Sequence, residues 1–155
     1  MTLEERETLV KDLCARVPYG VKVEAFHYTE AQTLRCVDYK RANCILDGDD
    51  AFVHIIANGK IYIKPYLRKP SSMTKEEFKR VNEIINAVDH DGYFYVQDPS
   101  YYIGLQLQTS DIGCVTAPGL TAAFDYLYSI HIDVNNLIEK GLAIEVTEDN
   151  NPYKK

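Results

Sequence analysis

The dipeptide Asn58-Gly59 is the feature that most constrains how this chain can fold. Both residues tolerate positive φ, and such a pair between two strand-forming runs predicts an antiparallel hairpin with a two-residue loop. The runs on either side span residues 51–57 and 60–67 and are rich in β-branched and aromatic side chains. A sheet is therefore expected around this turn, with the two runs as neighbouring strands.

The register of this hairpin predicts which side chains share a face. A two-residue loop places His54 opposite Ile63, and it places Lys64 opposite Val53 on the other face. Pro65 lacks an N–H, so it is expected at a strand end or on a sheet edge. Alternation predicts a mainly apolar face made of Phe52, His54, Ile56, Ile61 and Ile63.

A well-marked helix start follows the second run. Thr74 and Glu77 have the spacing of a capping box, in which the hydroxyl and the carboxylate each bind a backbone N–H of the first turn. The helix is predicted over residues 75–88. Its apolar stripe consists of Phe78, Val81, Ile84, Ile85 and Val88.

The parts before this region predict a helix and three strands. Thr2 and Glu5 form a second capping box, and apolar residues at helical spacing predict a helix over 3–16 that ends before Pro18. The strands are predicted over residues 21–28, 33–39 and 42–46.

The parts after it predict another strand pair over 93–96 and 101–108, then a helix with Pro118 in its first turn. Asp133 is predicted to cap a short last helix that stops at Gly141, and residues 142–146 return as a strand. The polar end, residues 149–155, is expected to fray.

These elements together predict the α+β class. The expected architecture is an antiparallel sheet with helices packed mainly on one face. A chain of 155 residues is expected to form one domain, here over residues 1–148.

Composition excludes several classes of function. The net charge of −6 argues against a protein that binds nucleic acid, which needs a basic face. No apolar run is long enough for a membrane span, and the charged N-terminus does not resemble a signal peptide. The four cysteines lack the close spacing of a zinc or redox site, so they are predicted to be free thiols in a cytoplasmic protein.

Three stretches resemble a family of small uncharacterised proteins from prophages and mobile elements of gut Bacteroides-type bacteria. They are DLCARVPYGVK at 12–22, the region 53–77 around IKPYLRKPSSMTKEE, and the region 124–145 around LIEKGLAIE. The central stretch is the most specific of the three. The resemblance implies an accessory cytoplasmic protein of a mobile element, and it carries over no catalytic residues.

Two sets of residues are candidates for binding. Lys64, Tyr66 and Arg68 precede the helix that begins after Thr74, so they could hold an anion near its N-terminus. His131 and Asp133 form the second set, at a predicted junction between two helices. No metal site and no cofactor is predicted, because the acidic turns of the sequence are explained by ordinary turn and helix-stop chemistry.

The leading functional hypothesis is a non-enzymatic interaction module whose partner is a host or phage protein. The alternative is a small enzyme or anionic-ligand binder that uses the region from Lys64 to Arg68. A deep polar pocket would favour the alternative, and a broad exposed aromatic face would favour the interaction module.

Overall fold

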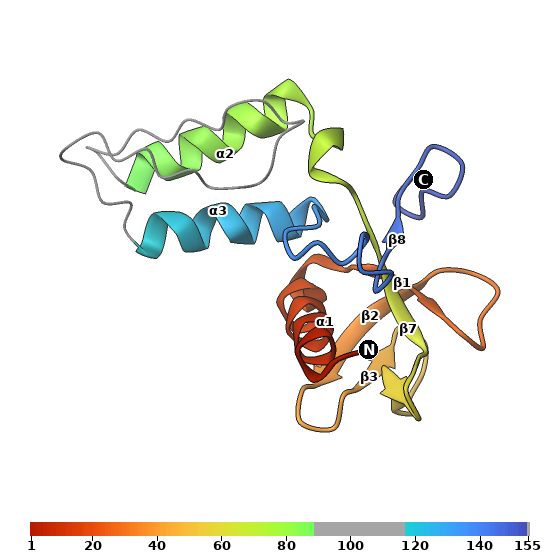
Figure 1. Ribbon diagram of the computed structural model, residues 1–155. Helices are drawn as coiled ribbons and strands as arrows, with labels where there is room; N and C mark the ends of the chain where they lie inside the picture. The colour runs from red at the N-terminus through yellow and green to blue at the C-terminus, as the bar shows by residue number, and fades with distance from the viewer. Residues whose placement is uncertain (89–116, 155) are drawn as a thin grey trace. The chain divides into compact units, whose positions relative to one another are not determined.

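The structure is a computed structural model that describes residues 1–88 and 117–154 (Figure 1). Contacts along the chain divide it into two compact units. The sheet unit is made of residues 1–68 and 135–155, and the helical unit is made of residues 69–134. Each unit has a hydrophobic core of its own.

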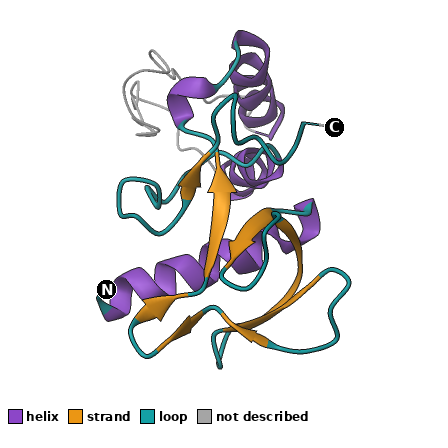
Figure 2. Ribbon diagram, turned by 90° about the vertical axis from the view of Figure 1, so that its right-hand side faces the viewer, coloured by secondary structure: helices purple, strands orange, loops and turns teal. Residues whose placement is uncertain are grey.

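The sheet unit begins with helix α1, Leu3–Arg16, which has the bounds that its sequence predicts. Both bonds of the capping box are present, from the Glu5 N–H to Thr2 Oγ1 at 3.1 Å and from the Thr2 N–H to Glu5 Oε2 at 2.6 Å. A 3₁₀ turn with Pro18 and a left-handed Gly20 at φ +64° end the helix. The helix lies against the sheet (Figures 1 and 2), and the core contains its side chains Leu9, Val10 and Leu13.

The sheet of this unit has the strand order β4-β3-β2-β1-β7-β8. Every neighbouring pair is antiparallel except β7 with β8, which run parallel. A mostly antiparallel sheet together with helices confirms the predicted α+β class. The strands are β1 Lys22–Ala25, β2 Gln32–Asp38, β3 Asn43–Leu46, β4 Val53–His54, β7 Ile63–Leu67 and β8 Ile144–Glu145.

The Asn58-Gly59 turn forms as predicted, but the hairpin around it is short. Both residues have positive φ, 51° and 74°, and the turn joins β5, Ile56–Ala57, to β6, Lys60–Ile61. One further bond joins the arms, from the Tyr62 N–H to the Ile55 carbonyl at 2.9 Å. Beyond it the arms separate, because β4 pairs with β3 while β7 pairs with β1.

This separation makes the predicted apolar face wrong at His54 and Phe52, whereas Ile63 is buried in the core and Ile56 and Ile61 pack against it. His54 is exposed, and its Nδ1 lies 2.6 Å from Asn43 Oδ1 on β3. Phe52 is 56% exposed, whereas Ile55, which the alternation assigned to the opposite face, is fully buried in the core. Whether these side chains are buried depends on the strand with which each arm pairs. The local alternation along the arm does not determine it.

Pro65 lies inside strand β7 rather than at its end, opposite Val23 on β1. The Phe26 N–H binds the Tyr62 carbonyl at 3.1 Å, and antiparallel pairs alternate, so the Val23–Pro65 pair is a non-hydrogen-bonded one. Strand β8 pairs with β7 only from Tyr66 onward. The missing N–H of Pro65 therefore removes no bond from the sheet.

The helical unit contains a 3₁₀ turn, Pro70–Ser72, and the helices α2, Lys75–Val88, and α3, Ala117–Ser129. The Glu77 N–H binds Thr74 Oγ1 at 3.1 Å and the Thr74 N–H binds Glu77 Oε2 at 2.9 Å, so the predicted capping box is confirmed. Helices α2 and α3 lie side by side (Figure 1). Their shared core consists of Val81, Ile85, Ala123, Leu127 and Ile132.

The predictions for the later part of the chain have different outcomes. The strands expected over 93–96 and 101–108 lie outside the described residues, as does Cys114. The short last helix expected after Asp133 is wrong, because residues 134–141 form bends and turns, with Asn136 at φ 57°. Gly141 does adopt the expected left-handed conformation at φ 68°, and β8 follows it.

Candidate functional site

The predicted residues Lys64 and Tyr66 share the less buried face of β7, since Ile63, Pro65 and Leu67 alternate with them as buried residues. Both are half-buried.

The partners of these two residues differ from those that the hairpin register implied. Lys64 lies opposite Glu24 on β1, so the expected pairing with Val53 is wrong. Tyr66 lies beside Ile144 on β8. Burial raises the pKa of the Tyr66 hydroxyl, and the negative charge of Glu24 raises it further. Arg68 follows the strand and is also half-buried.

The second predicted pair, His131 and Asp133, belongs to the helical unit. His131 follows α3 with a positive φ of 60°, and its N–H binds the Tyr128 carbonyl at 3.1 Å. Asp133 is only 5% exposed. Its predicted role as the cap of a last helix fails together with that helix. The two predicted sets therefore come from different units.

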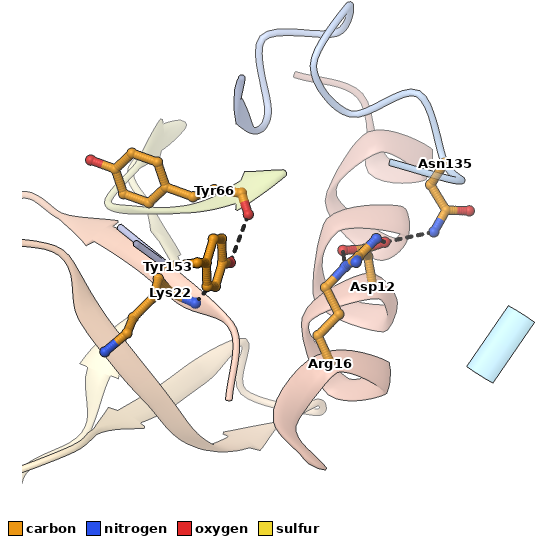
Figure 3. A network of polar contacts seen from close by, with 6 residues as sticks. All are labelled: Asp12, Arg16, Lys22, Tyr66, Asn135 and Tyr153. Carbon is orange, nitrogen blue, oxygen red and sulfur yellow. Dashed lines mark hydrogen bonds and ion pairs between the residues drawn. The ribbon is translucent and has the colours of Figure 1, made fainter. Parts of the chain in front are cut away.

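A buried ion pair that the sequence reasoning missed lies on α1 (Figure 3). Arg16 Nε is 2.6 Å and Arg16 Nη2 is 3.0 Å from the two carboxylate oxygens of Asp12, and neither side chain is exposed. Asn135 Nδ2 donates a third bond to Asp12 Oδ1 at 2.8 Å. The Asp-x-x-x-Arg spacing on the apolar side of the helix was the available signal. The cluster fixes residue 135 to the N-terminal helix.

Tyr153 is a second residue with a structural role in this region (Figure 3). Its hydroxyl donates to the Tyr66 carbonyl at 2.8 Å and accepts from the Lys22 N–H at 3.1 Å. Lys22 and Tyr66 are the next pair after Val23–Pro65, so by alternation these two groups would bind each other directly. The phenol hydroxyl is thus inserted into the ladder between β1 and β7. The segment 149–155 was expected to fray, but at Tyr153 it is hydrogen-bonded to the sheet.

An aromatic cluster is exposed where β1 ends, and it consists of Phe26, His27 and Tyr62. The Phe26 ring packs edge-on against the other two rings, with centroid distances of 5.1 Å to His27 and 5.8 Å to Tyr62. Phe26 is nevertheless 74% exposed. Sequence reasoning assigned it to a strand over 21–28, and only the end of β1 at Ala25 moves it into the loop.

The loop that carries Phe26 and His27 is held by two hydrogen bonds. The Phe26 N–H binds the Tyr62 carbonyl, and the Tyr28 hydroxyl donates to Asp49 Oδ2 at 2.6 Å. That bond raises the pKa of Tyr28 and lowers the pKa of Asp49, because it favours the neutral phenol and the ionised carboxylate. The exposed ring is therefore presented on a fixed backbone.

Residues 1–88 and 117–154 also include acidic residues, histidines and three cysteines. Within these ranges no three His, Cys, Asp or Glu side chains are grouped as metal ligands would be. Cys14, Cys36 and Cys44 are free thiols, as predicted, and burial raises the pKa of Cys44 to about 12. None of the described helices combines the length and the apolar character needed to cross a membrane.

Comparison with known proteins adds no family to this description. No protein-family model, no curated protein and no solved structure matches the chain.

Proposed function

We propose that this protein is a non-enzymatic interaction module that binds a host or phage protein through the aromatic cluster of Phe26, His27 and Tyr62. We further propose that it works in the bacterial cytoplasm as an accessory product of a prophage or mobile element. The second proposal rests on the resemblance of residues 12–22, 53–77 and 124–145 to proteins of that origin.

The observation that supports binding is the exposure of Phe26, at 74%. Large aromatic side chains are enriched at the buried centres of protein interfaces and often supply most of the binding energy. Covering a phenylalanine that is now in water stabilises a complex by about 1.5–3 kcal/mol. The ring has no such cover in the sheet unit, and a partner surface would provide it.

The fixed loop strengthens this reading. Association costs free energy for every side chain and loop that must be ordered, so a surface that is already ordered loses less on binding. The backbone bond from Phe26 to Tyr62 and the side-chain bond from Tyr28 to Asp49 hold the loop before any partner arrives.

Site-specific photocrosslinking tests the proposal. Phe26 is replaced by the photoreactive phenylalanine analogue p-benzoylphenylalanine, which keeps an aromatic ring at this position. The purified protein is irradiated in lysate of a gut Bacteroides-type bacterium. A discrete crosslinked product, identified by mass spectrometry and reduced by added unlabelled protein, is expected.

Phe52 provides the matched control, because it is also an exposed phenylalanine, at 56%, and lies outside the cluster. The same analogue at position 52 should not give this product. Equal crosslinking from both positions, or from neither, would contradict an interface centred on Phe26.

A further inference from the structure

A pocket lies beside the N-terminal half of α1, within the sheet unit and apart from the aromatic cluster. Its volume is about 170 Å³. Val10 and Ala42 are almost fully buried and form its apolar floor, at 2% and 1% exposure. The complete lining is Leu3, Arg6, Glu7, Val10, Tyr39, Lys40 and Ala42.

The charges around this pocket are unbalanced. Arg6 and Lys40 both line it, and neither has an ion-pair partner among the described residues. The carboxylate of Glu7 lies 3.6 Å from Lys11 Nζ, so its charge is already compensated. Two unpaired cations therefore flank an apolar floor on a chain whose net charge is −6. Such a rim attracts a carboxylate.

The rim also carries apolar side chains in water. Leu3 and Tyr39 line the pocket and both are exposed. Pockets for drug-sized ligands have about 300–1,000 Å³, whereas a cavity of about 150 Å³ accepts a benzene-sized group. The size thus suits one apolar side chain and is too small for a cofactor.

We propose that this pocket binds the C-terminal residue of a partner protein, when that residue is apolar. The side chain occupies the floor over Val10 and Ala42, and the terminal carboxylate lies between Arg6 and Lys40. This goes beyond the interaction module proposed above, because it uses other residues and names the partner's chemistry.

A chain terminus fits better than an internal acidic segment for a geometric reason. In an extended peptide, neighbouring side chains point to opposite faces, so an apolar residue and the acidic residue next to it cannot both enter one small pocket. A C-terminal apolar residue carries its side chain and its carboxylate on the same Cα. Capture of terminal carboxylates is an established mode of peptide recognition.

The test uses the whole ¹⁵N-labelled protein and unlabelled peptides, followed by amide NMR shifts. The first peptide is acetyl-Gly-Ser-Gly-Leu with a free carboxylate. The second is the same peptide ending in an amide, and the third is acetyl-Gly-Leu-Glu-Gly-amide, which carries the acid internally. The free acid is expected to shift the Val10 and Ala42 amides saturably, with a dissociation constant in the millimolar range, as suits a one-residue contact.

Three variants locate the carboxylate. Arg6→Gln and Lys40→Gln should each weaken binding of the free acid about two- to fivefold, the worth of an exposed ion pair. Arg41→Gln is the matched control. Arg41 is a neighbouring cation whose guanidinium already pairs with Asp38 at 3.3 Å, so this change should leave the affinity unaltered.

Each remaining outcome contradicts the proposal. Equal binding of the amide would show that the carboxylate plays no part, and equal binding of the internal-acid peptide would remove the preference for a terminus. No saturable shift with any peptide would mean that the pocket binds no such ligand. None of these results bears on crosslinking from position 26, so the two proposals fail separately.

Discussion

Tyr153 shows how a single side chain can complete a sheet. Its hydroxyl satisfies a backbone donor on β1 and a backbone acceptor on β7 at the place where these strands do not bind each other. No local pattern in a polar segment could predict this, because the hydroxyl's partners lie 131 and 87 residues away in the sequence.

We predict that Tyr153→Phe lowers the free energy of unfolding by about 1–3 kcal/mol. The substitution leaves the Lys22 N–H and the Tyr66 carbonyl without their partner, and an unsatisfied buried group costs roughly this much. Urea unfolding measures the change. Tyr39→Phe is the control, because Tyr39 is exposed and its hydroxyl makes no hydrogen bond within the described part of the chain. Equal stability of both variants would refute the inserted hydroxyl.

The same residue predicts a dependence on pH. Burial raises the pKa of Tyr153 to about 12 from an ordinary value near 10. Folding therefore favours the protonated phenol, and its contribution is complete below pH 10 and falls as the pH rises to about 12. The stability advantage of the native protein over Tyr153→Phe should shrink across this window, by up to about 3 kcal/mol. An advantage that stays constant from pH 9 to 12 would contradict the assignment.

At the scale of elements, the sequence predicts what local contacts decide. The starts of α1 and α2 follow from capping boxes, in which residues three apart bind each other, and both helices have the predicted bounds. The Asn58-Gly59 turn is equally local. The arms beyond the turn are not decided locally, because one arm pairs with β3 and the other with β1. The burial of Ile55 depends on this pairing. The aromatic cluster was missed for the same reason, since it depends on where β1 ends.

The turn itself supplies a clear prediction. Gly59 has φ +74°, and a Cβ there would meet nothing within 4 Å, so any cost of substitution comes from the backbone alone. Gly59→Val should destabilise the protein by about 1–2 kcal/mol, because a β-branched residue resists this conformation. Gly59→Asn should cost clearly less, since asparagine tolerates it. Thermal unfolding compares the two variants, and equal melting temperatures would argue against a turn with positive φ.

At the scale of the whole molecule, the sheet unit is assembled from two distant parts of the chain. Residues 135–155 return to residues 1–68 and contribute β8, Asn135 and Tyr153. Asp12, which is paired with Arg16, also binds Asn135 at the start of the returning segment. A sequence window around α1 therefore contains only two of these three side chains.

A double-mutant cycle tests that closure. Asp12→Leu or Arg16→Met alone should cost about 3–5 kcal/mol, because each leaves a buried charge without its partner. The double variant should cost less than the sum of the two, since no charge remains buried. Chemical unfolding of the four proteins gives the coupling energy. Additive losses would mean that the two groups act independently.

Because two separate segments of the chain form the sheet unit, its parts become available at different times during synthesis. Residues 69–134, which are 66 residues by 134 − 69 + 1, must be translated before Asn135, which donates to Asp12, is added to the chain. At about 5–20 residues per second, this takes roughly 3–13 s. During that interval the nascent chain contains α1 and the first strands but lacks residues 135–155, which complete the sheet unit. The helical unit, encoded without interruption, is the part whose residues are all available first.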